Sequence, residues 1–154
     1  MQIRPLEKKN HAEIARLYQI RQAAYTIEAG LLSIQPDLFF PLQETLNDLQ
    51  NSTDEIFVSV MDGSITGAIF LEKLIASIVI SNLFVDPKFF RRGIARALIT
   101  HCLNLYPKQE FHVGTGKLNS PAIRLYETFK FETLKEEIVE PNLRIIKLRR
   151  LPSE

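Results

Sequence analysis

The stretch "FFRRGIARAL", residues 89–98, decides how the rest of the sequence is interpreted. From Ile94 onward apolar residues recur with helical spacing, which predicts a helix that begins directly after Gly93. The N-terminus of a helix presents unpaired backbone N–H groups and the positive end of the helix dipole, and both attract anions. Because Gly93 and Ala95 carry little or no side chain, a phosphate can approach these amides.

Three arginines surround the same turn. Arg91, Arg92 and Arg96 can donate charge-assisted hydrogen bonds to phosphate oxygens. A solvated loop with a glycine at the helix start is the alternative interpretation, since basic residues often precede helices. The favoured interpretation is a diphosphate-binding turn that comprises Arg91, Arg92, Gly93, Ile94, Ala95 and Arg96.

Length, composition and charge exclude several classes of protein. The chain has 154 residues, of which 45% are hydrophobic and 24% charged, and its net charge is +1. These values predict a single folded domain over residues 1–154. The chain lacks the large basic excess that non-specific binding to nucleic acid or to an anionic membrane uses, so we expect neither partner.

Cysteine content and hydropathy bear on the cellular compartment. The only cysteine, Cys102, excludes an intrachain disulfide and a cysteine-rich zinc site, and it favours a reducing compartment. The first ten residues lack the apolar segment of a signal peptide, and the most apolar run, residues 74–85, is too short to span a bilayer. We therefore expect a cytoplasmic protein without a membrane anchor.

After an initial strand, the N-terminal third reads as helical. Asn10 followed three residues later by Glu13 is typical of a helix N-terminus, and the predicted helix runs to the mid-twenties. Residues 27–52 contain a glycine and two prolines and predict an irregular arm of two short helices that are split near residues 36–41. The helical spacing in the first helix is carried by Ile14, Leu17, Tyr18 and Arg21.

Strands follow the arm. "EIFVSV" (55–60) and "ITGAIFLE" (65–72) are rich in β-branched and aromatic residues, and the Asp-Gly between them predicts a β-hairpin. "ASIVISNLFV" (76–85) is apolar almost throughout and predicts a central strand that ends at Asp86-Pro87.

The C-terminal part alternates helices and strands. The helix that begins at Ile94 ends before Pro107, "FHVGTG" (111–116) predicts a strand, and Ser120-Pro121 predicts the N-cap of the next helix. "TLKEEIV" (133–139) and "LRIIKLR" (143–149), joined through Glu140, Pro141 and Asn142, predict a closing antiparallel pair. This order predicts an α/β fold with a mostly antiparallel sheet, and a ligand is expected where the strand before residue 94 meets its helix.

Three features in this order resemble the GNAT family of N-acetyltransferases. They are an apolar strand that ends in "NLFVDP" (82–87), the basic turn, and "NSPAIRLYETFKFE" (119–132). The resemblance covers nearly the whole chain. It implies a mixed, mostly antiparallel central sheet flanked by helices, in which the strand that ends at Val85 splays away from its neighbour.

The resemblance also implies a binding mode for acetyl-CoA. The family pattern Gln/Arg-x-x-Gly-x-Gly/Ala corresponds to residues 90–95, and Phe90 departs from it. The diphosphate would bind the amides from Arg91 to Arg96. The pantetheine arm would lie beside Leu83, Phe84 and Val85 like an additional strand. We expect a β-bulge near residues 82–85, because such a bulge would separate the two strands.

Two further residues correspond to family positions. Asn119 lies at the start of the last helix and Tyr126 about two turns along it. The resemblance implies that Tyr126 lies near the coenzyme sulfur, where a hydroxyl would assist the departure of a thiolate whose pKa is about 8.5. The alternatives are a core tyrosine for Tyr126 and a helix cap for Asn119, and the cap is compatible with a binding role.

An acceptor amine must lose a proton before it attacks the thioester, so a base is required. The resemblance places the acceptor pocket at the irregular arm, which makes Glu28 and Glu44 the first candidates; Asp48 and Glu72 follow. Each of the four is equally compatible with a solvated surface residue. Ser81 and Asn82 could position a water molecule or stabilise the bulge.

The remaining reactive side chains are interpreted as structural. The three histidines are not spaced as a metal site, so no metal is assigned, and His101 lies on an apolar helix face. Cys102 reads as a small buried residue. Without a nucleophile, direct attack of the amine on acetyl-CoA is the simplest mechanism, and ping-pong kinetics would contradict it.

The expected function is acetyl-CoA-dependent N-acetyl transfer to a primary amine of a small molecule or a peptide. The aromatic and acidic residues of the arm suit a small cationic amine, a peptide N-terminus or a lysine. The alternatives are a non-catalytic acyl-CoA-binding or regulatory module, for which Phe90 argues, and a plain interaction domain. The closing strands could pair with a second copy, so a homodimer is possible.

Overall fold

The computed structural model describes residues 1–141 and 143–153. Asn142, assigned above to the connection between the last two strands, lies outside the described residues. The strands are β1 (Gln2–Pro5), β2 (Glu55–Met61), β3 (Ser64–Lys73), β4 (Ser77–Val85), β5 (Glu110–Gly116), β6 (Glu132–Glu140) and β7 (Leu143–Arg150). The helices are α1 (His11–Leu31), α2 (Leu46–Gln50), α3 (Ile94–Leu105) and α4 (Ser120–Thr128), with short 3₁₀ turns η1 (Pro36–Leu38), η2 (Phe40–Gln43) and η3 (Pro87–Phe89).

The strands form one mixed sheet in the order β1-β2-β3-β4-β5-β7-β6. Every neighbouring pair is antiparallel except β4 and β5, which are parallel and connected through α3. The α/β class, the hairpin, the central strand and the closing antiparallel pair predicted from the sequence are therefore confirmed.

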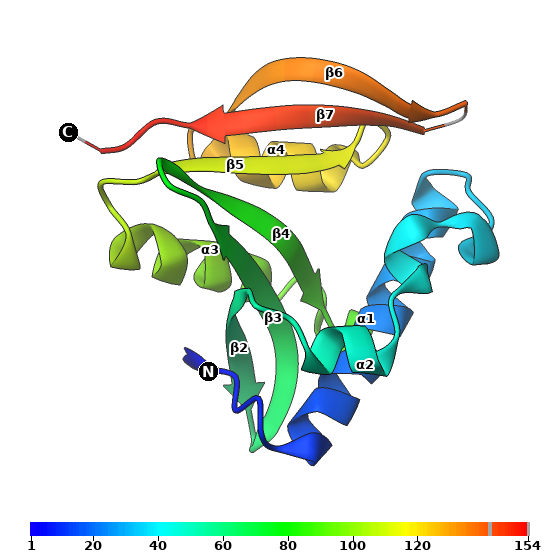
Figure 1. The fold of residues 1–154 in the computed structure, drawn as a ribbon, viewed down its shortest axis with the longest axis vertical. Coiled ribbons are helices and arrows are strands. Elements are labelled where there is room, and N and C mark those ends of the chain that lie inside the picture. Colours follow the sequence, from blue (N-terminus) through cyan, green and yellow to red (C-terminus); the bar gives the residue numbers. More distant parts are fainter. Residues whose placement is uncertain (142, 154) are drawn as a thin grey trace.

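The sheet opens between β4 and β5. These strands pair only over Ser77–Ile80 and Glu110–Val113 and then diverge. Figure 1 shows the result as a V, with the β1–β4 strands on one arm, β5–β7 on the other, and the C-terminal half of α1 near the open end. The predicted splay is thus confirmed, and within the described residues no strand pairs with this edge of β4 beyond Ile80.

A β-bulge marks the point of divergence, one residue before the predicted segment. Phe70 pairs with Asn82 and Leu71 with Ile80, so Ser81 is the additional residue on β4. An additional residue bends and twists its strand. The Ser81 hydroxyl donates a hydrogen bond to the Asp54 carboxylate (2.6 Å), which links the bulge to the chain segment before β2.

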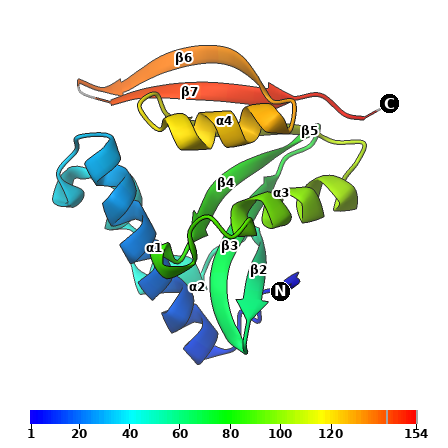
Figure 2. The same cartoon turned by 180° about the vertical axis from the view of Figure 1, so that it is seen from behind.

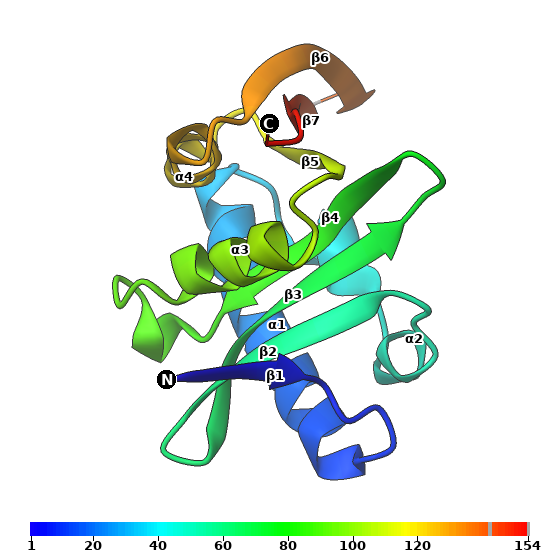
Figure 3. The same cartoon turned by 90° about the vertical axis from the view of Figure 1, so that its left-hand side faces the viewer.

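Two cores cover opposite faces of the β1–β4 strands, because successive strand residues point to opposite faces. Phe57, Ile69 and Val85 pack with α3 in one core, whereas Val58, Ala68 and Phe84 pack with α1 in the other. Figure 3 shows α1 and α3 on opposite sides of these strands, and Figure 2 shows α3 and α4 together in front of the sheet. Among the described residues, no helix is long and apolar enough to cross a membrane.

Helix α1 begins as predicted but ends later, at Leu31 instead of the mid-twenties. Ala29 in its last turns and the C-cap residue Leu32 share a small core with Phe39 of the arm, and this tertiary contact extends the helix. The arm itself contains the two 3₁₀ turns and α2, so the expected irregular arm is confirmed, with two 3₁₀ turns at the predicted split.

Removing the N-cap of α1 is expected to destabilise the protein modestly. The Asn10 side-chain oxygen accepts hydrogen bonds from the backbone N–H groups of Ala12 (3.0 Å) and Glu13 (3.3 Å). Asn10→Ala leaves these donors to water and should cost about 1 kcal/mol, equivalent to about 2–4 °C in Tm. Thermal unfolding measures it, with Asn10→Ser as the control that restores a cap; equal Tm values for all three proteins would contradict the role.

Candidate active site

The turn before α3 has the backbone that its sequence predicts. Gly93 is the N-cap of α3 with φ +76°, in the left-handed region where glycine carries no steric penalty, and Arg91 also has positive φ (63°). A Cβ added at Gly93 would meet no atom within 4 Å, so the space beside this residue is open. The first backbone bond of the helix is donated by Ala97 to Gly93.

The turn therefore presents a set of free donors. Within the described residues, none of the amides from Arg91 to Arg96 donates to a backbone carbonyl. The three arginines are exposed; Arg92 lies over the Phe89 ring, and Arg96 lies over the Phe129 ring with a hydrogen bond to the Thr128 hydroxyl (3.2 Å). Free amides, open space and nearby guanidinium groups fit a diphosphate.

The unpaired edge of β4 supplies further donors and acceptors. Asp86 donates its backbone N–H to Thr66 on the β3 side (2.8 Å), and in an antiparallel pair this direction alternates along the strand. The backbone groups of Leu83 and Val85 accordingly face the open side, while those of Phe84 face β3. An extended, amide-containing ligand could pair with this edge over Leu83–Val85.

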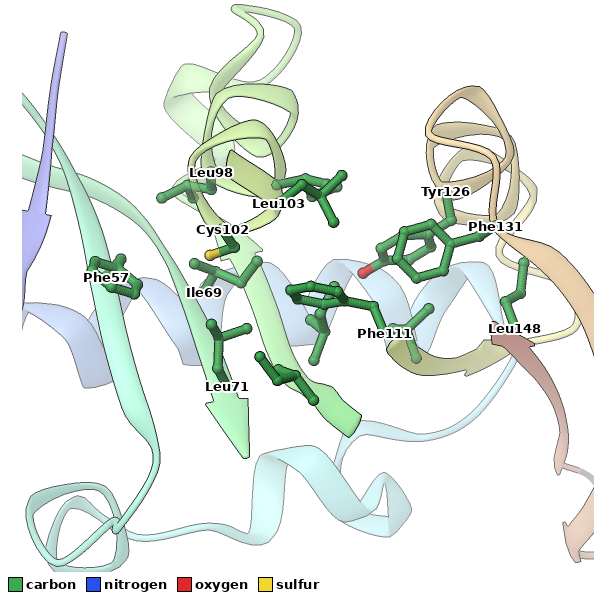
Figure 4. Packing of buried hydrophobic residues seen from close by; sticks show 14 of the residues in the cluster. Phe57, Ile69, Leu71, Leu98, Cys102, Leu103, Phe111, Tyr126, Phe131 and Leu148 are labelled. Carbon is green, nitrogen blue, oxygen red and sulfur yellow. The ribbon is translucent and has the colours of Figure 1, made fainter. Parts of the chain in front are cut away.

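Tyr126 lies inside the core at the open side of β5. Its side chain is 4% exposed and packs against Phe131 (ring centroids 5.4 Å apart), and Figure 4 shows its hydroxyl pointing away from α4. Among the described residues the hydroxyl has no hydrogen-bond partner. Burial raises the pKa of Tyr126, and the nearby Tyr25 and Glu28 raise it further, so the group keeps its proton. It is thus a core residue with a free donor.

The structure brings Glu28 of α1 to Asn119. The Asn119 side-chain nitrogen donates to the Glu28 carboxylate (2.7 Å) across the open end of the V. Burial raises the pKa of Glu28, and the Asn119 hydrogen bond lowers it in part. The Asn119 oxygen accepts from the Ala122 amide (3.2 Å), so Asn119 is the N-cap of α4. The cap alternative given for Asn119 is confirmed, and the prediction of Ser120 as the cap is wrong.

Glu44 lies elsewhere, on the arm. Its carboxylate forms an ion pair with Arg21 (2.8 Å) at the rim of a hollow of about 250 Å³. We call this the acidic hollow, because its lining contains three carboxylates and no basic residue. Glu72, the other carboxylate considered from the sequence, is not part of it. The residues that line the acidic hollow include Glu44, Asp48, Asp54, Phe70 and Asn82.

Sequence reasoning missed two residues of α1, Arg21 and Tyr25. The Asn82 oxygen accepts hydrogen bonds from both, from Arg21 at 3.1 Å and from the Tyr25 hydroxyl at 3.0 Å. Burial raises the pKa of Tyr25, while the charge of Arg21 and the backbone of Leu83 lower it in part. The available signal was an arginine on the apolar face of a helix, which indicates a buried charge with a dedicated partner.

His101 and Cys102 have the structural roles predicted for them. His101 packs edge-on against Phe57 with ring centroids 4.7 Å apart. Cys102 is buried in the α3 core, and burial raises the pKa of its thiol to about 12, so it stays protonated at neutral pH. Neither residue lies among the groups that surround the opening of the sheet.

Comparison with known proteins agrees with this geometry. The family model of the acetyltransferase (GNAT) domain matches residues 39–151. UPF0157 protein YqkA of Bacillus subtilis (strain 168) is 32% identical over 123 residues, which are 79% of this chain and 35% of that protein. The chain thus spans about a third of the length of this curated relative.

Solved structures share the fold at low sequence identity. The ribosomal-protein-S18-alanine N-acetyltransferase from Escherichia coli is 20% identical, with a TM-score of 0.77 over 98% of this chain and 92% of that chain. A putative streptothricin acetyltransferase from Bacillus anthracis str. Ames, in complex with acetyl coenzyme A, is 19% identical, with a TM-score of 0.61 over 71% of this chain and 69% of that chain. The matched family model, with which the shared fold agrees, shows that the chain belongs to the GNAT acetyltransferase family.

Proposed function

We propose that this protein transfers the acetyl group of acetyl-CoA to a primary amine by direct attack. One observation carries the proposal: the unpaired edge of β4 runs from Asn82, which lines the acidic hollow, to Val85, and η3 then leads the chain into the turn with free amides at Gly93. A diphosphate on the amides and a pantetheine arm along Leu83–Val85 would bring the thioester to the β-bulge. There the acyl group would meet an amine that enters from the hollow.

Tyr126 would assist the leaving group. As the amine nitrogen forms its bond to the acyl carbon, the carbon–sulfur bond breaks and negative charge develops on sulfur. The Tyr126 hydroxyl keeps its proton and has no acceptor among the described residues, so it can direct its hydrogen at that sulfur. The thiolate would leave with a hydrogen bond from the Tyr126 hydroxyl, which keeps its own proton.

Glu28 is the favoured base. Its pKa is raised, which suits a carboxylate that must take a proton near neutral pH, and it lies close enough to Tyr126 to influence that hydroxyl. Glu44 is less suited, because its carboxylate is already bound by Arg21. The proton would pass from the amine to Glu28 directly or through water.

The acceptor is proposed to be cationic. With Glu44 paired to Arg21, the carboxylates of Asp48 and Asp54 remain in the acidic hollow. The backbone and side chain of Thr45 lower the pKa of Asp48, so that group stays ionised. A polyamine, a lysine side chain or a basic peptide N-terminus would match this charge.

Release of free CoA tests the function. The protein is mixed with acetyl-CoA and a panel of diamines, lysine derivatives and neutral primary amines, and thiol formation is followed with each. We expect release that depends on a cationic amine. The alternative, a non-catalytic acyl-CoA-binding module, is motivated by Phe90, which is 44% exposed where the family pattern has a polar residue. Calorimetric binding of acetyl-CoA without release by any amine would favour that alternative.

Glu28→Gln is expected to change how stability depends on pH. The folded protein holds the Glu28 proton more tightly than the unfolded chain, whose pKa is near the ordinary value of 4.5. This stabilisation is complete below that pKa and is lost as the pH rises through the raised folded pKa. Glutamine keeps an oxygen for Asn119, so the Tm of the variant minus that of the wild type should increase from pH 4 to pH 8.

The same variant tests the base. Loss of the carboxylate should lower kcat and remove the acid limb of the pH profile that Glu28 produces. A Tm difference that stays constant with pH would contradict the buried, ionisable Glu28. An unchanged kcat and pH profile would exclude Glu28 as the base while leaving acetyl transfer itself intact.

A further inference from the structure

Arg21 is a buried charge that neither the diphosphate-binding turn nor the proposed chemistry uses. Its side chain is 2% exposed, although arginine is almost never this buried without dedicated partners. It projects from the middle of α1 at a position that otherwise carries apolar residues. Such a group is costly to bury, so its contacts indicate what it holds in place.

The guanidinium joins three separate segments. One nitrogen donates to the Pro41 carbonyl in the arm (2.6 Å), and another lies 2.8 Å from the Glu44 carboxylate. The same second nitrogen donates to the Asn82 oxygen next to the β-bulge (3.1 Å), and the group lies over the Tyr25 ring. One side chain of α1 therefore fixes the arm against the strand where the sheet opens.

These contacts also orient Asn82. Its side-chain oxygen accepts from both Arg21 and the Tyr25 hydroxyl, so this end of the amide is directed toward α1. The Asn82 amide nitrogen is then directed away from the Arg21 guanidinium and the Tyr25 hydroxyl. Asn82 also lines the acidic hollow. Glu44, the other partner of Arg21, lines the hollow as well. Two walls of the hollow are thus set by one guanidinium.

We propose that Arg21 is a positioning residue for the acceptor: it sets the shape and charge of the acidic hollow and thereby the affinity for the amine. The inference rests on the proposed acetyl transfer. Arg21 contacts neither the amides of residues 91–96 nor the free edge at Leu83–Val85, so acetyl-CoA binding should not depend on it.

Steady-state kinetics of Arg21→Met and Arg21→Lys test the inference. Methionine removes the polar contacts with Pro41, Glu44 and Asn82. The KM for the amine should then rise about tenfold, while the KM for acetyl-CoA changes less than about twofold. Lysine keeps a charge for Glu44 but lacks the planar fork whose two nitrogens bond the Pro41 carbonyl and Asn82 separately. The amine KM of Arg21→Lys should therefore lie between those of the wild type and Arg21→Met.

Arg4→Met is the matched control. Arg4 of β1 pairs with Glu13 of α1 through two hydrogen bonds (3.1 and 3.0 Å), and neither residue lines the acidic hollow. It should lower Tm without changing either KM. If Arg21→Met alters both KM values together, or neither, Arg21 is a structural residue only and the inference is overturned.

Binding measurements separate this inference from the proposed function. If the wild type releases no CoA with any amine, acetyl transfer fails, and the calorimetric Kd of 1,4-diaminobutane is measured in saturating CoA. A Kd about tenfold weaker for Arg21→Met but not for Arg4→Met supports the positioning role. Equal Kd values, or no binding to the wild type, overturn it.

Discussion

Tyr126→Phe is expected to lower kcat by about 10²–10³-fold and to leave the KM for acetyl-CoA unchanged. Only the hydroxyl is removed, and it has no hydrogen-bond partner among the described residues, so the packing of the ring against Phe131 persists. The loss would fall on the step in which the carbon–sulfur bond breaks. Rates of CoA release under saturating amine and acetyl-CoA measure it directly.

Tyr106→Phe is the matched control for this variant. Tyr106 lies at the C-terminal end of α3, away from the opening between β4 and β5, and its hydroxyl donates to the Glu55 carboxylate. Its removal should cost some stability and no activity, the reverse of Tyr126→Phe. Equal rates for wild type and Tyr126→Phe would leave Tyr126 as a core residue without a catalytic role.

Gly93→Asp is expected to weaken acetyl-CoA binding about a hundredfold, which corresponds to the loss of one or two charge-assisted hydrogen bonds of about 1.5–3 kcal/mol each. The new carboxylate would occupy the open space beside the turn, accept from the free amides of α3 and repel a diphosphate. Isothermal calorimetry with acetyl-CoA gives the Kd.

Gly63→Asp separates this effect from backbone strain. Gly63 lies in the turn between β2 and β3 with φ +78°, close to the +76° of Gly93, and a Cβ there also meets nothing within 4 Å. Both variants introduce the same residue into the left-handed region, at a similar cost of about 1–2 kcal/mol in stability. Only Gly93→Asp should affect acetyl-CoA. A comparable loss of affinity in both would show that the turn before α3 is not the diphosphate site.

Much of the fold follows from local signals. The Asp-Gly turn and its flanking β-branched residues specify the β2–β3 hairpin, and Gly93 specifies the start of α3, because these conformations depend on neighbouring residues alone. The sequence offers two caps for α4. Asn119 and Ser120 are both good caps in sequence, and the hydrogen bond from Ala122 selects Asn119.

The candidate site was only partly accessible from the sequence. The diphosphate-binding turn is contiguous, so its glycine and arginines could be assigned together. The pairing of Glu28 with Asn119 joins residues that are 91 positions apart, and the contact of Arg21 with Asn82 spans 61. No local pattern encodes such contacts, since they depend on how α1 crosses the open end of the sheet.

The sequence by itself determined most of the elements, the α/β class and the glycine turn that begins α3, because hydrophobic periodicity, glycine and proline act over a few residues. Only the tertiary structure decided which of the candidate carboxylates is buried and which is ion-paired. Burial beside Asn119 raises the pKa of Glu28, whereas Arg21 binds Glu44. Burial and charge pairing depend on distances through space, which the linear order of residues does not contain.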